Sequence, residues 1–139
     1  MQATPEQHAT LSRIVIRILD DWEIDDNNKI KLLGLPAETK PRMMNHYRNN
    51  SELPDTSEIN QRIEQLVAIS EALRTTYPHN YRMSTHWLNT PHRRFNQRTP
   101  LSMILDRGLN GMMAVRADLD CAYAWSLTEN MQNTNPTNS

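Results

Sequence analysis

Apolar side chains recur at the three- and four-residue spacing of amphipathic helices along most of the chain, and no run alternates as a β-strand would. The first predicted helix carries charged residues between the members of one apolar stripe. Its inward-facing residues are Leu11, Ile14, Val15, Ile18, Leu19 and Trp22. The chain therefore opens with an amphipathic helix.

Two shorter helices are predicted next. The first covers residues 29–33 and ends at Gly34, with Pro36 just beyond it. The second is capped by Thr39 and has Pro41 in its first turn. Its inward residues are Met44 and Tyr47, and its outward residues are Arg42, Asn45, His46 and Arg48.

A fourth helix follows, with Asp55 or Ser57 as its cap. Its apolar stripe consists of Ile59, Ile63, Leu66, Val67, Ser70 and Leu73. Pro78 interrupts this pattern, and beyond it a short fifth helix carries Met83, Trp87 and Leu88 before a turn at Pro91.

The last two helices have clear end signals. Thr99 and Pro100 form a cap and first-residue pair, and Gly108 closes the helix that they open. A final helix is predicted from Asn110 to about Trp125. The chain is predicted to be all-α, with a helix-turn-helix domain over residues 1–78, a second helical domain over 79–127 and a disordered polar tail over 128–139.

Composition narrows the function classes. A chain of 139 residues with 37% hydrophobic content suits one compact unit or two very small ones. The amino-terminal stretch lacks a secretion signal, the single cysteine Cys121 cannot form an internal disulfide, and no apolar run is long enough to span a membrane. We expect a cytoplasmic protein without a membrane partner.

No catalytic or metal-binding pattern is evident. With three glycines and no phosphate-binding motif, nucleotide hydrolysis is not expected. His86 and His92 lie near each other in sequence, but neither HExxH nor paired CxxC accompanies them. We therefore expect neither an enzyme nor a metal or other cofactor.

Residues 29–48 have the outline of a helix-turn-helix, whose second helix would enter a major groove. Thr39 and Lys40 at its start could hold a phosphate. The predicted DNA contacts are Thr39, Lys40, Arg42, Asn45, His46 and Arg48. The alternative is a solvated helix face with no ligand.

A second cluster is rich in arginine and contains no lysine. Its members are Arg82, Arg93, Arg94, Arg98, Arg107 and Arg116. Guanidinium groups pair with carboxylates or phosphates and are enriched at interfaces, so this cluster fits an acidic protein or a phosphate-bearing partner. The alternative is ordinary surface charge around a core that contains Trp87 and Phe95.

The same segment resembles the toxin-binding domain of Xre/MbcA/ParS-type antitoxins. The resemblance rests on Trp87, Leu88, Pro91, Phe95, Pro100, Leu101, Leu105, Gly108, Val115 and Leu119, in this order and spacing. A glycine commonly follows the family's Phe, whereas Asn96 follows Phe95 here, and Ser102 stands where an acidic residue commonly follows the Pro-Leu pair.

The resemblance implies an antitoxin that blocks the active-site entrance of a RES-domain toxin, an enzyme that consumes NAD. It also implies autorepression, in which the helix-turn-helix binds operator DNA. The residues predicted to contact the toxin are Arg93, Arg94, Arg98, Arg107, Arg116, Tyr123 and Trp125. A homodimer is expected if operator half-sites are read. The alternative is a stand-alone transcriptional regulator whose carboxy-terminal module dimerises it.

Overall fold

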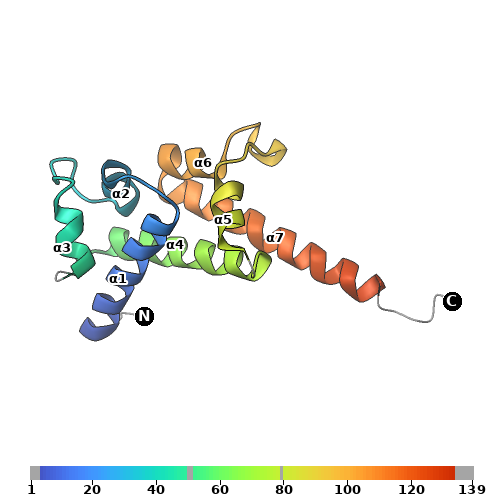
Figure 1. Ribbon diagram of the computed structural model, residues 1–139, viewed down its shortest axis with the longest axis horizontal. Helices are drawn as coiled ribbons and strands as arrows, with labels where there is room; N and C mark the ends of the chain where they lie inside the picture. The colour runs from blue at the N-terminus through green and yellow to red at the C-terminus, as the bar shows by residue number, and fades with distance from the viewer. Residues whose placement is uncertain (1–3, 50–51, 79, 134–139) are drawn as a thin grey trace.

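The computed structural model describes residues 4–49, 52–78 and 80–133, without the side chains of Pro5, Tyr81 and residues 123–133. The described residues form α-helices and one 3-10 helix and contain no β-strand, which confirms the all-α prediction (Figure 1). The elements are α1 (Pro5–Asp21), α2 (Asp26–Leu33), α3 (Met43–Asn49), α4 (Ser57–Thr76), α5 (Tyr81–Leu88), η1 (Arg93–Phe95), α6 (Pro100–Arg107) and α7 (Leu109–Asn133).

Helix α4 is the element that both halves of the chain share. It packs against α1 and α2 on the amino-terminal side and against α5 and α7 on the carboxy-terminal side. Its buried side chains are Ile59, Ile63, Leu66, Ile69 and Leu73. Ile69 joins the predicted stripe, whereas Val67 and Ser70 are only half-buried. The helix is confirmed, but its cap is Thr56 and not Asp55 or Ser57, because the Thr56 hydroxyl accepts the Ile59 N–H.

Helix α1 confirms the predicted stripe except at one position. Its capping box joins Thr4 and Gln7, and its core side chains pack between α3 and α4. Ile16 is buried, whereas Ile14 is 41% exposed. The prediction for Ile14 was wrong because the contacts with α3 and α4 select a different side of α1 at this turn.

Helices α2 and α3 are both present, but their starts differ from the prediction. Asp25 caps α2 by accepting the Asn28 N–H, so that α2 begins before residue 29. Gly34, in the left-handed conformation, ends α2 as predicted. Helix α3 begins at Met43, because a turn occupies positions 41 and 42. The predicted cap at Thr39 was therefore wrong, and residues 34–42 form a longer connection than the tight turn that we expected.

The carboxy-terminal helices confirm the predicted end signals. The Thr99 hydroxyl accepts the Ser102 N–H at the start of α6, with Pro100 as its first residue. Gly108 ends α6, and α7 starts immediately afterwards. Helix α7 is longer than predicted and includes residues 128–133, which we had assigned to the tail. Residues 134–139 lie outside the described residues.

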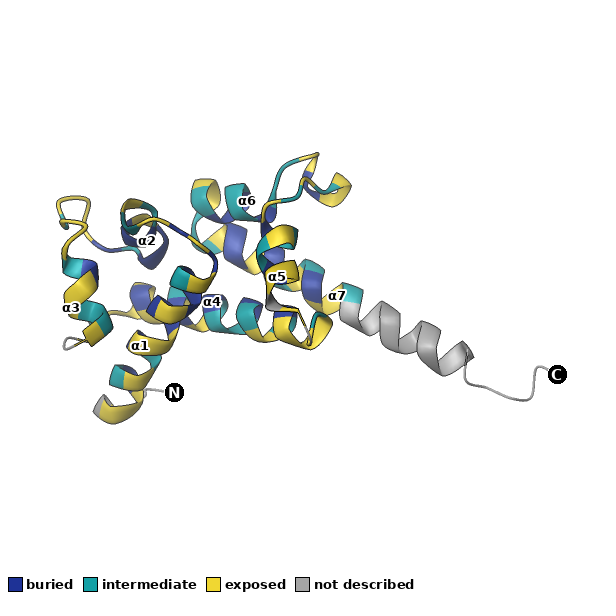
Figure 2. Cartoon of the chain, viewed as in Figure 1, coloured by how far each residue is buried: buried dark blue, intermediate teal, exposed yellow. Residues whose placement is uncertain are grey.

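The two halves share one hydrophobic core, with buried side chains from α1 through α7 (Figure 2). Arg62 of α4 lies where α2 and α6 meet. It donates hydrogen bonds to the carbonyl oxygens of Lys31 (3.3 Å) and Leu32 (3.1 Å) at the end of α2. A Cβ added to Gly34 or Gly108 would lie about 3 Å from the Arg62 side chain. Both glycines have a positive φ, and their lack of a side chain also permits the close approach of Arg62.

Helix α7 crosses α6 at a glycine. A Cβ at Gly111 would lie 2.1 Å from the Met103 carbonyl oxygen. This distance is far shorter than any that real Cβ atoms show. The backbones of α6 and α7 are therefore closer here than any other residue type permits.

We predict that Gly111→Ala lowers the free energy of unfolding by at least about 2 kcal/mol, because α6 and α7 must separate. Urea denaturation checks this value. The matched control is Asn110→Ala, an exposed neighbour on the same helix, which should change stability by less than about 0.5 kcal/mol. Equal stability of the two variants would contradict the close crossing.

Candidate functional site

The segment between α5 and α6 is a closed loop that presents two arginines. The His92 N–H donates to the Arg98 carbonyl at 3.1 Å, and the Gln97 N–H donates to the His92 carbonyl at 3.0 Å. The 3-10 helix η1 lies inside this loop and buries Phe95. The loop is therefore anchored by backbone bonds and by one aromatic side chain, while Arg93 and Arg94 stay exposed.

Asn96 follows Phe95 at the position where the antitoxins that this segment resembles commonly have a glycine. Its φ is 55°, in the left-handed region, and Gln97 follows with a φ of 67°. Asparagine tolerates this region better than most residues that have a side chain. The replacement is therefore compatible with the same loop conformation.

An aromatic cluster supports the loop. The rings of Trp87 and His92 have centroids 5.0 Å apart, and the His92 ring meets Phe95 edge-on at 6.2 Å. The His92 Nε2 also lies 3.1 Å from the Trp87 carbonyl oxygen. Phe95 is a core residue, as predicted, whereas Trp87 is only half-buried. Trp87 therefore has apolar surface available for a partner.

This surface lines a pocket between α4, η1 and α7, with a volume of about 500 Å³. Tyr77, Trp87 and Leu119 contribute its apolar walls. Arg93 and Arg94 lie at the same pocket, together with Asp118. A half-open pocket with aromatic walls and adjacent guanidinium groups is typical of a protein-binding surface.

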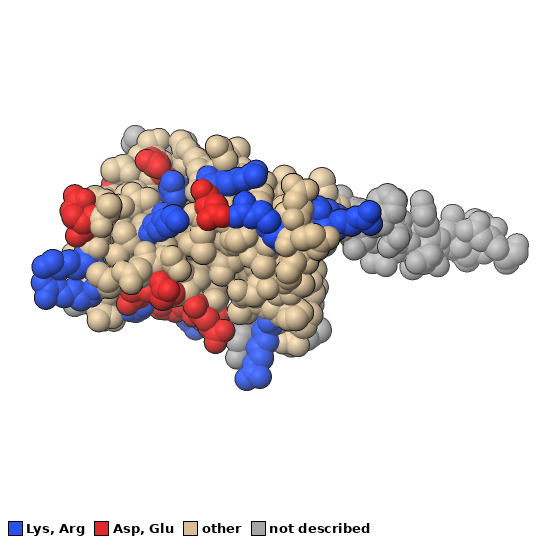
Figure 3. Space-filling view, turned by 90° about the horizontal axis from the view of Figure 1, so that it is seen from above, with Lys and Arg blue, Asp and Glu red and all other residues tan. Residues whose placement is uncertain are grey.

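The predicted arginines differ in how far they are already paired. Arg94 donates to Asp118 at 3.0 Å, and this hydrogen bond raises the pKa of Arg94. Arg98 pairs with Asp106, and Arg116 contacts Gln65 at 3.3 Å and Asp120 at 3.9 Å. Arg93 and Arg107 are exposed and form no ion pair within the described residues. Figure 3 shows several Lys and Arg side chains in the upper part of the view with an acidic side chain among them, and a larger acidic group below them.

A comparison with known protein families finds a match for the segment that contains the pocket beside Trp87. Residues 72–120 match the antitoxin Xre/MbcA/ParS C-terminal toxin-binding domain. The match starts in the last turns of α4 and includes α5, η1, α6 and the first part of α7. Comparison with curated proteins gives no match. The toxin-binding domain supports an antitoxin role, implies a toxin as partner and suggests a regulatory protein rather than an enzyme.

Most of the residues predicted to bind the toxin lie inside this toxin-binding domain. Arg93, Arg94, Arg98 and Arg107 come from η1, α6 and the loop between them, and Arg116 lies on α7. The side chains of Tyr123 and Trp125 lie outside the described residues. The sequence alone does not identify Tyr77 and Asp118 as pocket residues, because Tyr77 follows α4, Asp118 lies on α7, and both reach η1 only in the folded chain.

The predicted DNA-binding residues are not equally available. Lys40, Arg42 and His46 are exposed near the start of α3, and Thr39 is half-buried. Arg48, by contrast, is held by internal bonds, and its Nη1 donates to the Asn45 side chain at 2.6 Å. The exposed candidates are therefore fewer than the sequence suggested.

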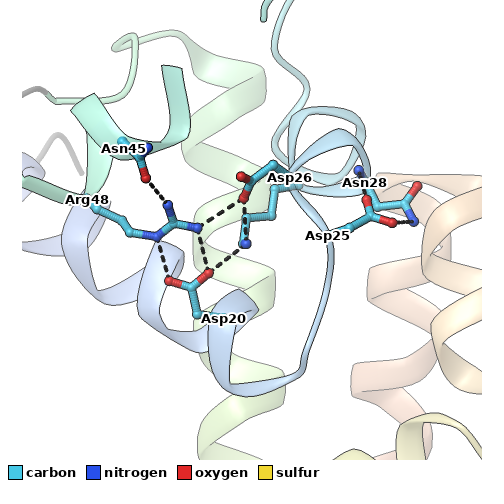
Figure 4. Close-up of polar contacts among 7 residues, drawn as sticks. Asp20, Asp25, Asp26, Asn28, Asn45 and Arg48 are labelled. Carbon is cyan, nitrogen blue, oxygen red and sulfur yellow. Dashed lines mark hydrogen bonds and ion pairs between the residues drawn. The ribbon is translucent and has the colours of Figure 1, made fainter. Parts of the chain in front are cut away.

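An ion-pair network accounts for the position of Arg48 (Figure 4). The Arg48 Nε lies 2.8 Å from Asp20 of α1, and its Nη2 lies 3.0 Å from Asp26 of α2. The same two carboxylates hold the buried amine of Lys29, at 2.6 Å and 2.9 Å. Helices α1, α2 and α3 are therefore joined by two cations and two anions. The sequence alone does not reveal this network, because Asp20 and Arg48 lie far apart in the chain.

The network lowers the pKa of both carboxyl groups. Hydrogen bonding from Arg48 is the largest cause at Asp20, and hydrogen bonding from Lys29 is the largest cause at Asp26. A carboxyl whose pKa is lower in the folded state stabilises the fold above its unfolded pKa. This stabilisation is lost as the pH falls through the lowered pKa of the folded state.

We predict that Asp20→Asn lowers the free energy of unfolding by about 2 kcal/mol at pH 7, because buried Lys29 loses one of two carboxylates. The difference from the unmodified protein should shrink below about pH 4, where the carboxyl groups of the unfolded chain become protonated. Urea denaturation at pH 7 and below about pH 4 measures this difference in the free energy of unfolding. Glu64→Gln, an exposed change on α4, is the control. A loss of the same size at both pH values would contradict the electrostatic origin.

No helix within the described residues is long and apolar enough to cross a membrane.

Proposed function

We propose that this protein is a cytoplasmic antitoxin that neutralises a RES-domain toxin, an enzyme that consumes NAD, by covering the entrance of the toxin's active site. The observation that carries the proposal is the pocket beside Trp87, which lies within the segment that matches the toxin-binding family. The RES toxin and the steric mechanism follow from the resemblance of this segment to antitoxins of that type.

The charge distribution supports an acidic partner surface. Residues 79–127 contain six arginines and three aspartates, whereas residues 1–78 contain nine Lys and Arg and twelve Asp and Glu. The carboxy-terminal domain is therefore the basic part of a nearly neutral chain. Among the five arginines predicted to contact the toxin, Arg93 and Arg107 have no ion pair with a described residue. Their charges are therefore available to a toxin without breaking an internal bond.

We predict that the double variant Arg93→Glu and Arg107→Glu raises the Kd for the toxin at least about tenfold, because reversed charges replace attraction with repulsion. Calorimetric titration of the full chain with the RES toxin measures the Kd, and NAD consumption by the toxin measures neutralisation. Arg82→Glu, an exposed charge reversal on α5 outside the pocket, is the control. An unchanged Kd for the double variant would remove both arginines from the toxin contact. Failure of the unmodified chain to stop NAD consumption would contradict the proposal itself.

A second proposed function is autorepression through binding of operator DNA by α2 and α3. It is supported by the exposed cationic groups of Lys40 and Arg42 and by exposed His46, which lie together before and within α3. Within residues 1–78, acidic residues outnumber basic ones, which opposes tight binding of DNA. The proposed contact therefore depends on a small number of ion pairs with DNA phosphates.

We predict that Lys40→Ala with Arg42→Ala weakens binding to the operator at least about tenfold and lowers the slope of log K against log salt by about 2, as expected for two lost phosphate contacts. Gel shifts over a salt series measure both values. Arg82→Ala, at an exposed arginine of α5, should leave them unchanged. DNA binding without any toxin binding would instead favour the stand-alone regulator.

A further inference from the structure

The pocket beside Trp87 offers different groups to an occupant on its two sides. On the α4 side, the hydroxyls of Thr75 and Thr76 each donate to a carbonyl oxygen one turn earlier in the helix, at 2.9 Å. The hydrogens of these hydroxyls are used within the chain, so the two threonines present acceptor oxygens to an occupant. On the opposite side, Arg93 and Arg94 of η1 present only donors. An anionic group of an occupant is therefore bound at η1.

The apolar walls of the pocket suit a flat ring. Tyr77 and Trp87 are half-buried and keep part of their aromatic surface open to solvent, whereas Leu119 is only 3% exposed. The Trp87 ring is held by its contact with the His92 ring, at 5.0 Å between centroids. Aromatic side chains pack favourably against other rings in offset or edge-on arrangements. An aromatic side chain of a partner therefore fits between these walls.

The arginine and carboxylate groups of the lining leave one positive charge unmatched. The Arg94 Nη1 donates to Asp118 at 3.0 Å, and the Asp118 side chain is only 18% exposed. Arg93 is exposed and forms no ion pair with any residue that the structure describes. A single carboxylate of an occupant therefore balances the charge of this lining, and Arg93 can bind it through two parallel hydrogen bonds.

We propose that the pocket takes a segment of the toxin in which an aromatic residue stands next to an aspartate or a glutamate. The aromatic ring packs against Tyr77 and Trp87, and the neighbouring carboxylate accepts hydrogen bonds from Arg93. Asp118 keeps Arg94 occupied and thereby limits the pocket to one carboxylate. This inference rests on the proposed function, which supplies the toxin as occupant, and it names the side chains by which the toxin is recognised.

The same charges disfavour a nucleic acid at this pocket. A nucleic acid carries a negative charge on every phosphate, whereas Arg93 is the arginine of the lining that has no carboxylate partner. Asp118 would repel the phosphates that Arg93 does not bind. An aromatic residue beside one carboxylate brings a single charge and a single apolar surface, which matches what the pocket offers.

Selection from a phage-displayed library of random peptides on the immobilised full chain tests which side chains the pocket accepts. The enriched peptides should share an aromatic residue next to Asp or Glu. Calorimetric titration with one such peptide, synthesised, gives its Kd for the chain. Trp87→Ala and Arg93→Gln should each raise this Kd at least about tenfold, because one removes an aromatic wall and the other the cation.

Two matched controls lie on α5 outside the pocket. Arg82→Gln changes another exposed arginine, and Met83→Ala truncates a 37% exposed apolar side chain on the helix that carries Trp87. Both variants should leave the Kd of the peptide unchanged. Circular dichroism verifies that every variant keeps its helices, and Arg93→Gln tests the pocket without removing an apolar side chain.

Asp118→Asn tests the limit to one carboxylate. The variant frees Arg94, so a peptide with two adjacent acidic residues should gain at least about tenfold more affinity from it than a peptide with one. A purely structural role of Asp118 would instead weaken the binding of both peptides to the same extent, and that result would overturn its assignment.

Three results would overturn the proposed occupant. They are enriched peptides without an acidic residue, a Kd that Arg93→Gln leaves unchanged, and displacement of the peptide by an equal concentration of adenosine monophosphate. An excess of the peptide should also restore NAD consumption by a toxin that the chain has neutralised, and no restoration would overturn the toxin as occupant. Because the peptide titrations contain no toxin, failure of the pocket is distinguished from failure of the chain to neutralise the toxin.

Discussion

The shared burial of helix α4 is the constraint on which the rest of the structure depends. Helix α4 packs on α1 and α2 and also on α5 and α7, so neither half of the chain has a separate core. Arg62 adds polar bonds at the same junction, where it satisfies carbonyl oxygens at the end of α2 and lies between Gly34 and Gly108. These contacts fix the toxin-binding domain relative to α1–α3. A substitution at this junction is therefore expected to affect both the toxin-binding domain and helices α1–α3.

The cations of the two halves have different roles. In the amino-terminal half, Lys29 and Arg48 are bound to Asp20 and Asp26, and they hold three helices together. In the toxin-binding domain, Arg94 and Arg98 are paired at the surface, where ion pairs contribute little to stability. Exposed arginines of this kind can exchange an internal carboxylate for one on a partner at small cost. The electrostatics of the chain thus separates a structural network from a surface suited to binding.

Burial also distinguishes core residues from residues available to partners. Phe95 is buried and closes the loop around η1, whereas Trp87 of the same aromatic cluster keeps part of its ring at the pocket. Ile14 belongs to the apolar pattern of α1, yet it faces an open groove. Trp87 and Ile14 are therefore large apolar side chains that the fold covers only in part.

The sequence by itself determined the helical class, the end signals at Thr99, Pro100 and Gly108, and the resemblance of residues around Trp87 to a toxin-binding domain. These features depend on local propensity and spacing, which a single chain displays directly. It also determined that arginines cluster near η1. Whether each is free or paired depends on which carboxylates the fold brings within reach, as it brings Asp118 of α7 to Arg94.

Only the tertiary structure decided the rest. The network of Lys29 and Arg48 and the groove beside Ile14 arise from contacts between residues that are distant in the sequence. Helical periodicity shows that a helix has an apolar side, but it does not show which neighbours cover it or which carboxylate reaches which cation. These features are defined only when α1, α2, α5 and α7 pack on α4 and α3 packs on α1, because only then are the distances that set charge pairing and burial fixed.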